Sequence, residues 1–249
     1  MDLTVCGSSG THASPGRACS SYLVEHDGYR LLLDCGNGSL SNLLSVCGAA
    51  DVDTVLLTHL HPDHIVDVYG LYYALRFDSG GPRTVGLVGP AGTTEFLTRL
   101  LPADSAAMFD QTLPLRTARA GEVLELGPLT VRLYPAFHPV ETLAPRITAG
   151  DRVLAYSGDS GQTDALIDCA AGADLFVCDA SWLERNGPHP EGIHMTGAQA
   201  GTTAAAAGAA RLLVTHVFPA NDPDQVAAEA AGLFEGDVLV ADDRDRIRV

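Results

Sequence analysis

The sequence of 249 residues contains no lysine, so all 15 of its basic side chains are arginines, and they face 31 acidic ones. The formal net charge at pH 7 is −16. Proteins that grip DNA or RNA along the backbone do so by neutralising phosphates with basic side chains. The charge balance therefore argues against DNA as a partner and makes RNA a weaker expectation than a small molecule. A small phosphate ester stays compatible with it, because a bound metal ion can dominate the local field.

Long apolar runs and cysteine motifs are also missing. No apolar stretch reaches the ~20 residues that span a bilayer, and the chain opens on a strand-like segment without a basic leader. The six cysteines show no Cys-x-x-Cys spacing. Most of them lie in apolar segments, where a thiol behaves as a small hydrophobe. We therefore expect a reduced, cytoplasmic protein with no membrane partner.

The remaining composition is typical of a compact α/β protein, with 46% hydrophobic and 18% charged residues. Strands are expected at 3–6, 21–25, 29–34, 53–58, 85–89, 129–136, 144–149, 152–156, 174–179, 211–215 and 238–240, and helices at 37–47, 65–77, 93–101, 163–170, 197–208 and 223–233. No Pro/Ser/Gly-rich linker divides the chain. This order favours one domain over residues 1–249, folded as a layered αββα sandwich.

The motif Thr-His-Leu-His-Pro-Asp-His at residues 58–64 is the strongest chemical signal in the chain. It follows an apolar, strand-like segment. His59 and His61 are two positions apart, so on an extended backbone they point to the same side. Asp63 and His64 come after a proline turn and can fold back beside them. The spacing therefore predicts a metal site.

Three further candidate ligands each follow a predicted strand: His138, Asp159 and His216. Residues that carry chemistry commonly gather on loops at one end of a rigid sheet. Seven ligands are too many for one tetrahedral zinc ion but suit two. We assign them as His59, His61 and His138 to a first ion and Asp63, His64 and His216 to a second, with Asp159 bridging. Zinc fits this donor set best, and manganese or iron would also be accepted.

These residues, in this order, resemble the metallo-β-lactamase superfamily. The resemblance covers nearly the whole chain and implies an αββα fold with a dinuclear hydrolytic site. β-Lactamases themselves carry cysteine where this chain has Asp159, which argues against antibiotic hydrolysis. Di-iron relatives carry glutamate in place of His61, which argues against oxygen reduction.

Two further segments, Cys-Asp-Ala-Ser-Trp at 178–182 and Gly-Ile-His-Met-Thr-Gly at 192–197, resemble paired elements of the tRNA 3′-end processing nucleases. The resemblance implies that His194 is the general acid and that Asp179 orients it. The catalytic group would then be His194, Asp179 and the metal ligand Asp63. The alternative is that His194 caps the helix expected at 197–208.

Other strings of this chain resemble small cyclic-nucleotide phosphodiesterases of the same branch. Only 20 residues separate His138 from Asp159, which leaves no room for the arm with which the tRNA nucleases grip tRNA. We therefore expect a hydroxide bridging two metal ions to hydrolyse a small phosphodiester, with His194 as acid. The alternatives are a tRNA 3′-end endonuclease and a thioester hydrolase of the glyoxalase type.

Several residues carry weaker expectations. Asp34 is expected either to orient a ligand imidazole or to be a simple turn residue. The loop 8–11 could approach a phosphate through its backbone amides, and Arg146 could pair with phosphate or form an ion pair at a sheet edge. Aromatic residues that could stack on a base or belong to the core are Tyr72, Tyr73, Phe77 and Trp182. The apolar segment 71–75 would suit a homodimer contact or the core.

Overall fold

The computed structural model describes residues 1–249 and contains two seven-stranded sheets packed against each other. The first sheet has the strand order β14-β1-β2-β3-β4-β5-β6. Its strands are β1 (Asp2–Gly7), β2 (Ser21–His26), β3 (Tyr29–Leu33), β4 (Thr54–Leu56), β5 (Gly86–Gly89), β6 (Leu115–Thr117) and β14 (Arg246–Arg248). Strands β1 to β3 are antiparallel, whereas β3 to β6 run parallel.

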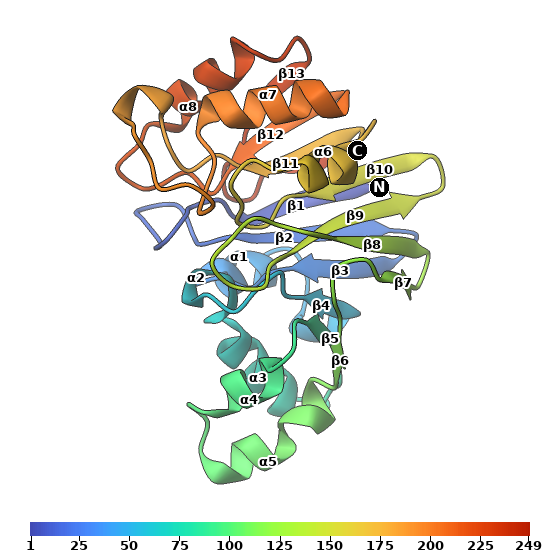
Figure 1. Ribbon diagram of the computed structural model, residues 1–249. Helices are drawn as coiled ribbons and strands as arrows, with labels where there is room; N and C mark the ends of the chain where they lie inside the picture. Colours follow the sequence, from blue (N-terminus) through green and yellow to red (C-terminus); the bar gives the residue numbers. More distant parts are fainter.

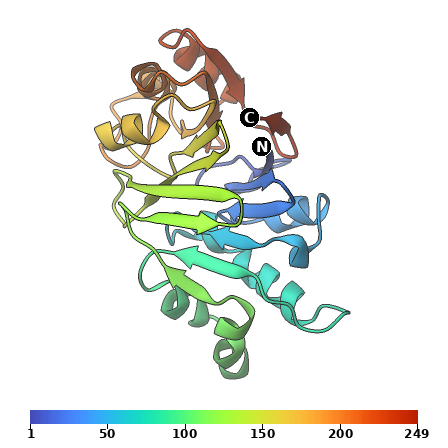
Figure 2. The same ribbon diagram turned by 90° about the vertical axis from the view of Figure 1, so that its right-hand side faces the viewer.

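The second sheet repeats this plan with the order β13-β12-β11-β10-β9-β8-β7. Its strands are β7 (Val123–Leu126), β8 (Leu129–Pro135), β9 (Leu143–Ala149), β10 (Arg152–Tyr156), β11 (Leu175–Asp179), β12 (Arg211–Thr215) and β13 (Asp237–Val240). Strands β7 to β10 are antiparallel and β10 to β13 are parallel. The last strand, β14, returns to the first sheet beside β1, so the two chain ends lie close together (Figure 2).

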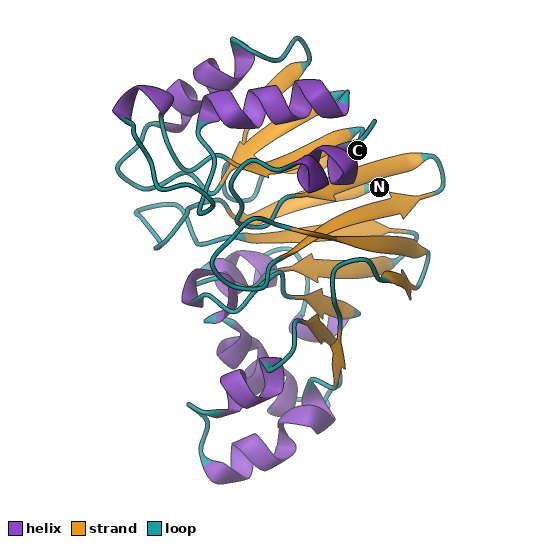
Figure 3. Ribbon diagram, in the orientation of Figure 1, coloured by secondary structure: helices purple, strands orange, loops and turns teal.

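Helices cover the outer face of each sheet (Figures 1 and 3). They are α1 (Ser39–Leu44), α2 (Pro62–Ile65), α3 (Val68–Arg76), α4 (Thr93–Thr98) and α5 (Ala103–Thr112) on the first sheet, and α6 (Asp164–Ala170), α7 (Gly197–Ala207) and α8 (Pro223–Ala231) on the second. Apolar side chains from both sheets form the central core, and each helical layer adds a core of its own. The expected αββα sandwich is therefore confirmed.

Some elements were not expected from the sequence. No element was expected between residues 102 and 128, yet α5, β6 and β7 lie there, and β14 was also missed. Helix α5 buries only Phe109 and Thr112, so it has no apolar stripe to reveal it. Strands β6 and β14 have three residues each at sheet edges, which is too short for a readable alternation.

The single helix expected at 65–77 is divided into α2 and α3. The break falls at Asp67, whose backbone N–H donates to the carbonyl of Cys35 at 3.0 Å. Its carboxylate accepts from the backbone N–H of Leu40 at 2.9 Å. Hydrogen bonds to the segment after β3 thus replace the hydrogen bonds within the helix at this point. The short α2 is left free to position the end of the His-x-His-x-Asp-His motif.

No helix in the structure combines the length and the apolar character that a membrane span requires.

All six cysteines are free thiols, and only Cys47 is not buried. Burial raises the pKa of Cys6, Cys19 and Cys169 to about 12, so these side chains are protonated near neutral pH. The thiolate is the reactive form of cysteine.

We therefore expect Ellman's reagent at pH 8 to titrate one thiol of the native protein first, that of Cys47. Its pKa is itself raised by burial, so we expect its reaction to be slower than that of an unfolded thiol. The other five should react only at the rate at which the chain opens, and all six should react at once in denaturant. A second native thiol that reacts as quickly as Cys47 would contradict the burial described here.

Candidate metal centre

All seven predicted metal ligands lie at one end of the sandwich, in segments that follow strands. The 58–64 motif follows β4 and runs into α2, and His138 follows β8. Asp159 and His216 follow the parallel strands β10 and β12. Because the carboxyl ends of parallel strands meet at the same edge of a sheet, their loops converge. These loops gather on the left-hand side of Figure 1.

The first group of donors consists of His59, His61, His138 and Asp159. Nδ1 of His61 lies 3.0 Å from Nε2 of His59 and 3.1 Å from Nε2 of His138. Oδ2 of Asp159 lies 3.6 Å from Nε2 of His59. The structure thus brings together the residues assigned to the first ion.

The second group consists of Asp63, His64, His216 and, again, Asp159. Nε2 of His216 lies 3.3 Å from Nε2 of His64 and 3.3 Å from Oδ2 of Asp63. Oδ1 of Asp159 lies 3.0 Å from Nε2 of His64 and 3.2 Å from Nε2 of His216. Asp159 therefore directs one carboxylate oxygen to each group, which is the position expected of a bridging ligand.

The geometry fits metal ions better than it fits hydrogen bonding alone. Two ligand atoms on a tetrahedral zinc, each about 2.0–2.2 Å from the ion, are roughly 3.4 Å apart, close to the separations found in both groups. Oδ1 of Asp159 is buried and receives no hydrogen bond when the facing Nε2 atoms of His64 and His216 are unprotonated. Such a group costs free energy unless a partner satisfies it, and a divalent cation between the imidazoles would do so.

Hydrogen bonds on the outer side of the imidazoles fix which nitrogen faces the site. Asp34 accepts from Nδ1–H of His64 at 2.8 Å and from the hydroxyl of Thr58 at 2.9 Å. That hydroxyl oxygen lies 3.0 Å from Nδ1 of His59 and accepts a hydrogen bond from its N–H. Tyr156 donates to the same carboxylate at 3.0 Å. Asp34 thus orients one ligand of each group, as expected for a ligand-orienting carboxylate.

The imidazoles of His138 and His216 are held in the same way. Nδ1–H of His138 donates to the carbonyl of Ile193 at 2.8 Å. Nδ1 of His216 lies 2.9 Å from Oγ of Ser181, whose hydroxyl in turn donates to Asp179 at 2.8 Å. With the outer nitrogen protonated, the inner Nε2 carries the lone pair that a metal requires. Thr58, Ser181 and Ile193 were missed by sequence reasoning, because only the folded chain brings them to the imidazoles.

The local charges favour a cation between the carboxylates. Although burial opposes a charged imidazole, Asp159 and Asp34 hold the pKa of His64 well above its ordinary value. Burial likewise opposes the charge on His216, but without a metal ion Asp159, Asp179 and Asp63 raise the pKa of His216 to about 10. A metal ion bound at Nε2 would take the place of that proton. In His59, by contrast, burial and the neighbouring His64 hold the pKa well below its ordinary value.

A third group lies against the second one and contains His194 and Asp179 with Asp159 and His216. Nδ1–H of His194 donates to Oδ2 of Asp179 at 2.8 Å. Burial raises the pKa of the Asp179 carboxyl, but His194 and His216 outweigh this and lower it, so Asp179 is ionised. The imidazole of His194 lies 5.0 Å from that of His216, centroid to centroid, and its side chain is 12% exposed. The pair is therefore in place at the mouth of the site, with Nε2 free.

The alternative role of His194 as a helix cap is wrong. The N-cap of α7 is Thr196, whose side-chain oxygen accepts from the backbone N–H of Gln199 at 3.1 Å. The side chain of Gln199 accepts in return from the backbone N–H of Thr196 at 3.0 Å. This reciprocal capping box leaves His194 outside the helix.

The loop 8–11 lies beside the site, but its amides do not form a phosphate cradle. The N–H groups of Ser8, Ser9 and Gly10 donate to backbone carbonyls, and that of Thr11 donates to Oδ2 of Asp63 at 2.9 Å. Gly10 is required by close approach, since a Cβ there would lie 2.7 Å from Nδ1 of His216. The loop therefore positions two ligands instead of binding phosphate.

Other weaker expectations are resolved by position. Tyr72 is buried in the helical core of the first sheet, and Tyr73 stacks on Phe77 there, so neither helix aromatic serves the site. Arg146 lies on β9 and donates to the carbonyl of Cys169 at 2.7 Å. Of the four aromatic residues considered, only Trp182 lies beside the site, 5.2 Å from His194 between ring centroids.

Asp34→Ala is expected to weaken both metal positions together, because Asp34 orients His64 directly and His59 through Thr58. Metal affinity should fall about 10–100-fold, and unfolding free energy by about 3 kcal/mol, because several buried donors lose their acceptor. Metal titration and thermal unfolding measure the two effects. Asp104→Ala, at an exposed position in the first turn of α5, is the control. Weakening of one metal position alone would contradict the shared role.

The comparisons with known proteins agree with this geometry. Residues 29–217 match the family described as beta-lactamase superfamily domain. An uncharacterized protein of Mycobacterium tuberculosis is 35% identical over 257 aligned positions, covering 99% of this chain and 92% of that protein. Ribonuclease Z of Mycobacterium bovis is 32% identical over 276 positions, covering 100% of this chain and 98% of that protein.

The probable metallo-hydrolase YhfI of Bacillus subtilis is similar in both sequence and structure. It is 32% identical over 250 positions, covering 97% of each chain. Its crystal structure, described as a metallo-beta-lactamase fold protein, superposes with a TM-score of 0.89 and covers 99% of both chains at 30% identity. The chain therefore belongs to the beta-lactamase superfamily, with the metallo-beta-lactamase fold and a His/Asp donor cluster typical of its metallo-hydrolases.

Proposed function

We propose that this protein is a dinuclear metal-dependent phosphodiesterase that acts on cyclic nucleotides or other small phosphodiesters. The observation that carries the proposal is the pair of His194 and Asp179 at the mouth of the donor cluster. Nδ1–H of His194 donates to Asp179 at 2.8 Å. Its ring lies 5.0 Å from His216 of one group and 5.7 Å from His138 of the other. His194 therefore lies next to both donor groups, where it would act as the proton donor.

The need for such a donor depends on the leaving group. Opening a ribose phosphodiester releases an alkoxide, which must be protonated as it departs, and a positioned acid typically contributes 10²–10⁴-fold to such a step. A thioester releases a thiolate, whose conjugate acid has a pKa of about 8.5 and which needs little help. The His194–Asp179 pair therefore favours a phosphodiester over a thioester.

The chain's own residues have distinct roles in this proposal. Two divalent ions held by the two donor groups, with zinc as the best fit, would supply Lewis-acid stabilisation and an activated water. Asp159 and Asp63 hold negative charge beside that position, and Asp63 is fixed by the N–H of Thr11. Asp179 accepts from Nδ1–H of His194, which leaves Nε2 as the nitrogen that would meet the substrate. His194 then delivers its Nε2 proton to the departing oxygen.

Processing of the tRNA 3′ end is the second candidate, and the ribonuclease Z relative favours it. Its alignment is longer than this chain, so that relative carries residues absent here. Between His138 and Asp159 this chain has only a short loop and the β9–β10 hairpin, which turns at Gly150. The absence of an arm and the charge of −16 support the small substrate.

A panel of substrates tests the choice. The metal-loaded protein is assayed with bis(p-nitrophenyl) phosphate, 3′,5′-cyclic AMP, a 2′,3′-cyclic nucleotide, a pre-tRNA and a thioester. We expect turnover of the aryl phosphodiester and of at least one cyclic nucleotide, with the pre-tRNA left intact. Cleavage of the pre-tRNA or the thioester alone would overturn the proposed substrate class.

A further inference from the structure

A cavity of about 350 Å³ opens beside His194 and contains none of the seven metal ligands. Its lining includes aromatic rings and polar side chains that each use only part of their hydrogen-bonding capacity: Phe137, Gln162, Trp182, Glu184, His189 and Gln199. This volume lies at the lower end of the range for small-molecule sites. The cavity can hold one small chemical group of a substrate whose reacting part lies at the metal centre.

Aromatic rings form part of the cavity lining. The ring of His189 stacks on Trp182, with centroids 4.7 Å apart and planes inclined by 14°. His194 meets Trp182 edge-on at 5.2 Å and 85°. Phe137 is 46% exposed although it is a large apolar residue. Aromatic lining with exposed ring area is typical of a site that receives another flat ring.

The position of Phe137 is fixed relative to the metal centre. It immediately precedes His138, its N–H donates to Oγ of Ser160 at 2.9 Å, and its carbonyl accepts from Gly161 at 2.8 Å. Its ring lies directly on the backbone of Gly192, where an added Cβ would be 2.6 Å from the ring. These contacts therefore fix the Phe137 side of the cavity relative to the ligand His138.

Polar atoms around the cavity offer both acceptors and a donor. Glu184 uses Oε2 to accept from the hydroxyl of Thr196 at 2.7 Å, so its Oε1 stays available. Gln162 uses its amide N–H to donate to Thr203 at 3.2 Å, which leaves its carbonyl free. Gln199 uses its carbonyl in the cap of α7, which leaves its NH₂ group. A nitrogen heterocycle carries both hydrogen-bond donors and acceptors along its edge, so it complements these groups.

The charge of the cavity excludes a second phosphate. No arginine is among its lining residues, whereas Glu184 and Glu191 are. Two carboxylates and no cation repel an anionic group. The part of a substrate that lies here is therefore not anionic.

We propose that this cavity binds the nucleobase of a nucleotide phosphodiester, with the base against the exposed Phe137 ring and beside Trp182, one face of which is covered by His189. The inference rests on the proposed phosphodiesterase function, which places the phosphate at the metal centre. It adds that the substrate is a nucleoside ester carrying a single phosphate. Base–aromatic stacking then supplies affinity that does not depend on base-specific contacts.

Trp182 is the only tryptophan of the chain, so intrinsic fluorescence reports directly on this cavity. The metal-loaded protein is titrated with adenosine 5′-monophosphate and, as a control, with ribose 5-phosphate, which carries the same phosphate without a base. We expect saturable quenching by the nucleotide and little change with the sugar phosphate. Equal responses to both, or none to the nucleotide, would overturn the proposal.

A matched pair of phenylalanine variants supplies a kinetic test. Phe137→Ala should raise KM for 3′,5′-cyclic AMP about 5- to 150-fold, the range for loss of one stacking partner. It should leave hydrolysis of methyl p-nitrophenyl phosphate, which has no base, nearly unchanged. Phe77→Ala, 71% exposed at the C-terminal end of α3, should change neither. An unchanged KM for 3′,5′-cyclic AMP in Phe137→Ala, or an equal loss on both substrates, would overturn the proposal.

The two proposals fail separately. If methyl p-nitrophenyl phosphate is hydrolysed but the nucleotide leaves Trp182 fluorescence unchanged, the base cavity is wrong and the phosphodiesterase function stands. If the nucleotide quenches fluorescence while no phosphodiester is hydrolysed, the proposed function is wrong, although the cavity still takes a base.

Discussion

Asp159→Asn is expected to remove both metal positions at once and to lower phosphodiester turnover by more than about 10³-fold. Asp159 is the one residue that belongs to both donor groups, with Oδ1 directed to one and Oδ2 to the other. Asparagine keeps the shape but loses the negative charge and one acceptor oxygen. Loss of partners that only orient a ligand already costs 10–100-fold, so loss of a shared ligand should cost more. Metal content after dialysis and turnover of bis(p-nitrophenyl) phosphate measure the effect.

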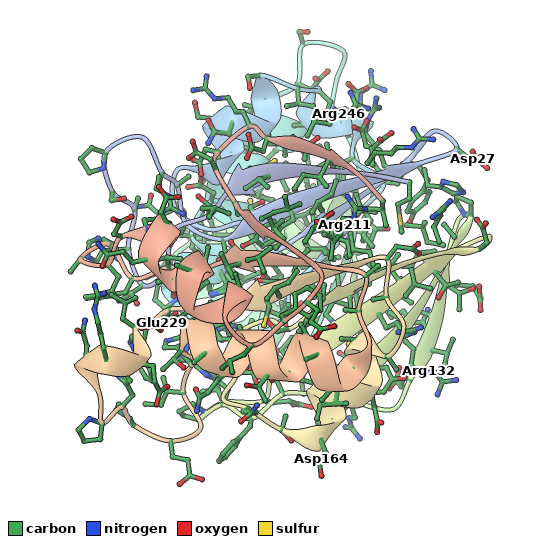
Figure 4. The ribbon with its side chains drawn as sticks, turned by 90° about the horizontal axis from the view of Figure 1, so that it is seen from above. Asp27, Arg132, Asp164, Arg211, Glu229 and Arg246 are labelled. Carbon is green, nitrogen blue, oxygen red and sulfur yellow. The ribbon has the colours of Figure 1, made fainter.

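Asp164→Asn is the matched control. It carries the same change five positions along the chain, at an exposed position in the first turn of α6 (Figure 4). We expect it to keep full metal content and full activity. If Asp159→Asn retained two ions with activity near that of the unaltered protein, Asp159 would not bridge and the two donor groups would be independent.

His194→Ala is expected to leave metal binding intact and to reduce turnover of 3′,5′-cyclic AMP about 10²–10⁴-fold, the contribution of a positioned general acid. The loss should depend on the leaving group. Hydrolysis of bis(p-nitrophenyl) phosphate should fall far less, because p-nitrophenolate is a weak base that departs without a proton. The measurement is the ratio of kcat on the two substrates, with metal content determined in parallel.

His26→Ala controls for the loss of an imidazole, since His26 lies on the β2–β3 hairpin, outside both donor groups. Next to it, Asp27 extends from the molecule at the hairpin tip (Figure 4). Equal losses on both substrates in His194→Ala would contradict proton donation and leave His194 with a binding role. The companion variant Asp179→Asn should show the same leaving-group dependence in weaker form.

The sequence was most informative where the chemistry is local. The His-x-His-x-Asp-His spacing fixes four donors within six positions, and β4 and α2 hold that loop as the pattern predicts. His138, Asp159 and His216 were each found as polar residues at a strand end. Asp159 and His216 meet because β10 to β12 are parallel, whereas His138 follows the antiparallel strand β8; periodicity alone establishes neither arrangement.

Sequence reasoning missed the groups that meet the ligands from the outside. The carbonyl of Ile193 and the hydroxyl of Ser181 hold His138 and His216. Such contacts depend on side-chain direction across loops that are distant in sequence, so no spacing rule reveals them. The cavity residues Phe137 and His189 were missed for the same reason. Trp182 was named among four aromatic candidates, but its position beside His194 is known only from the fold.

The central claim, a dinuclear hydrolase, is tested most directly by turnover as a function of ions bound. The protein is stripped with a chelator, and zinc is returned in steps while bound metal and bis(p-nitrophenyl) phosphate hydrolysis are measured on the same samples. The account predicts negligible activity in the stripped protein and a maximum at two ions per chain. Full activity without metal, a maximum at one ion, or two bound ions with no turnover of any phosphodiester would contradict it.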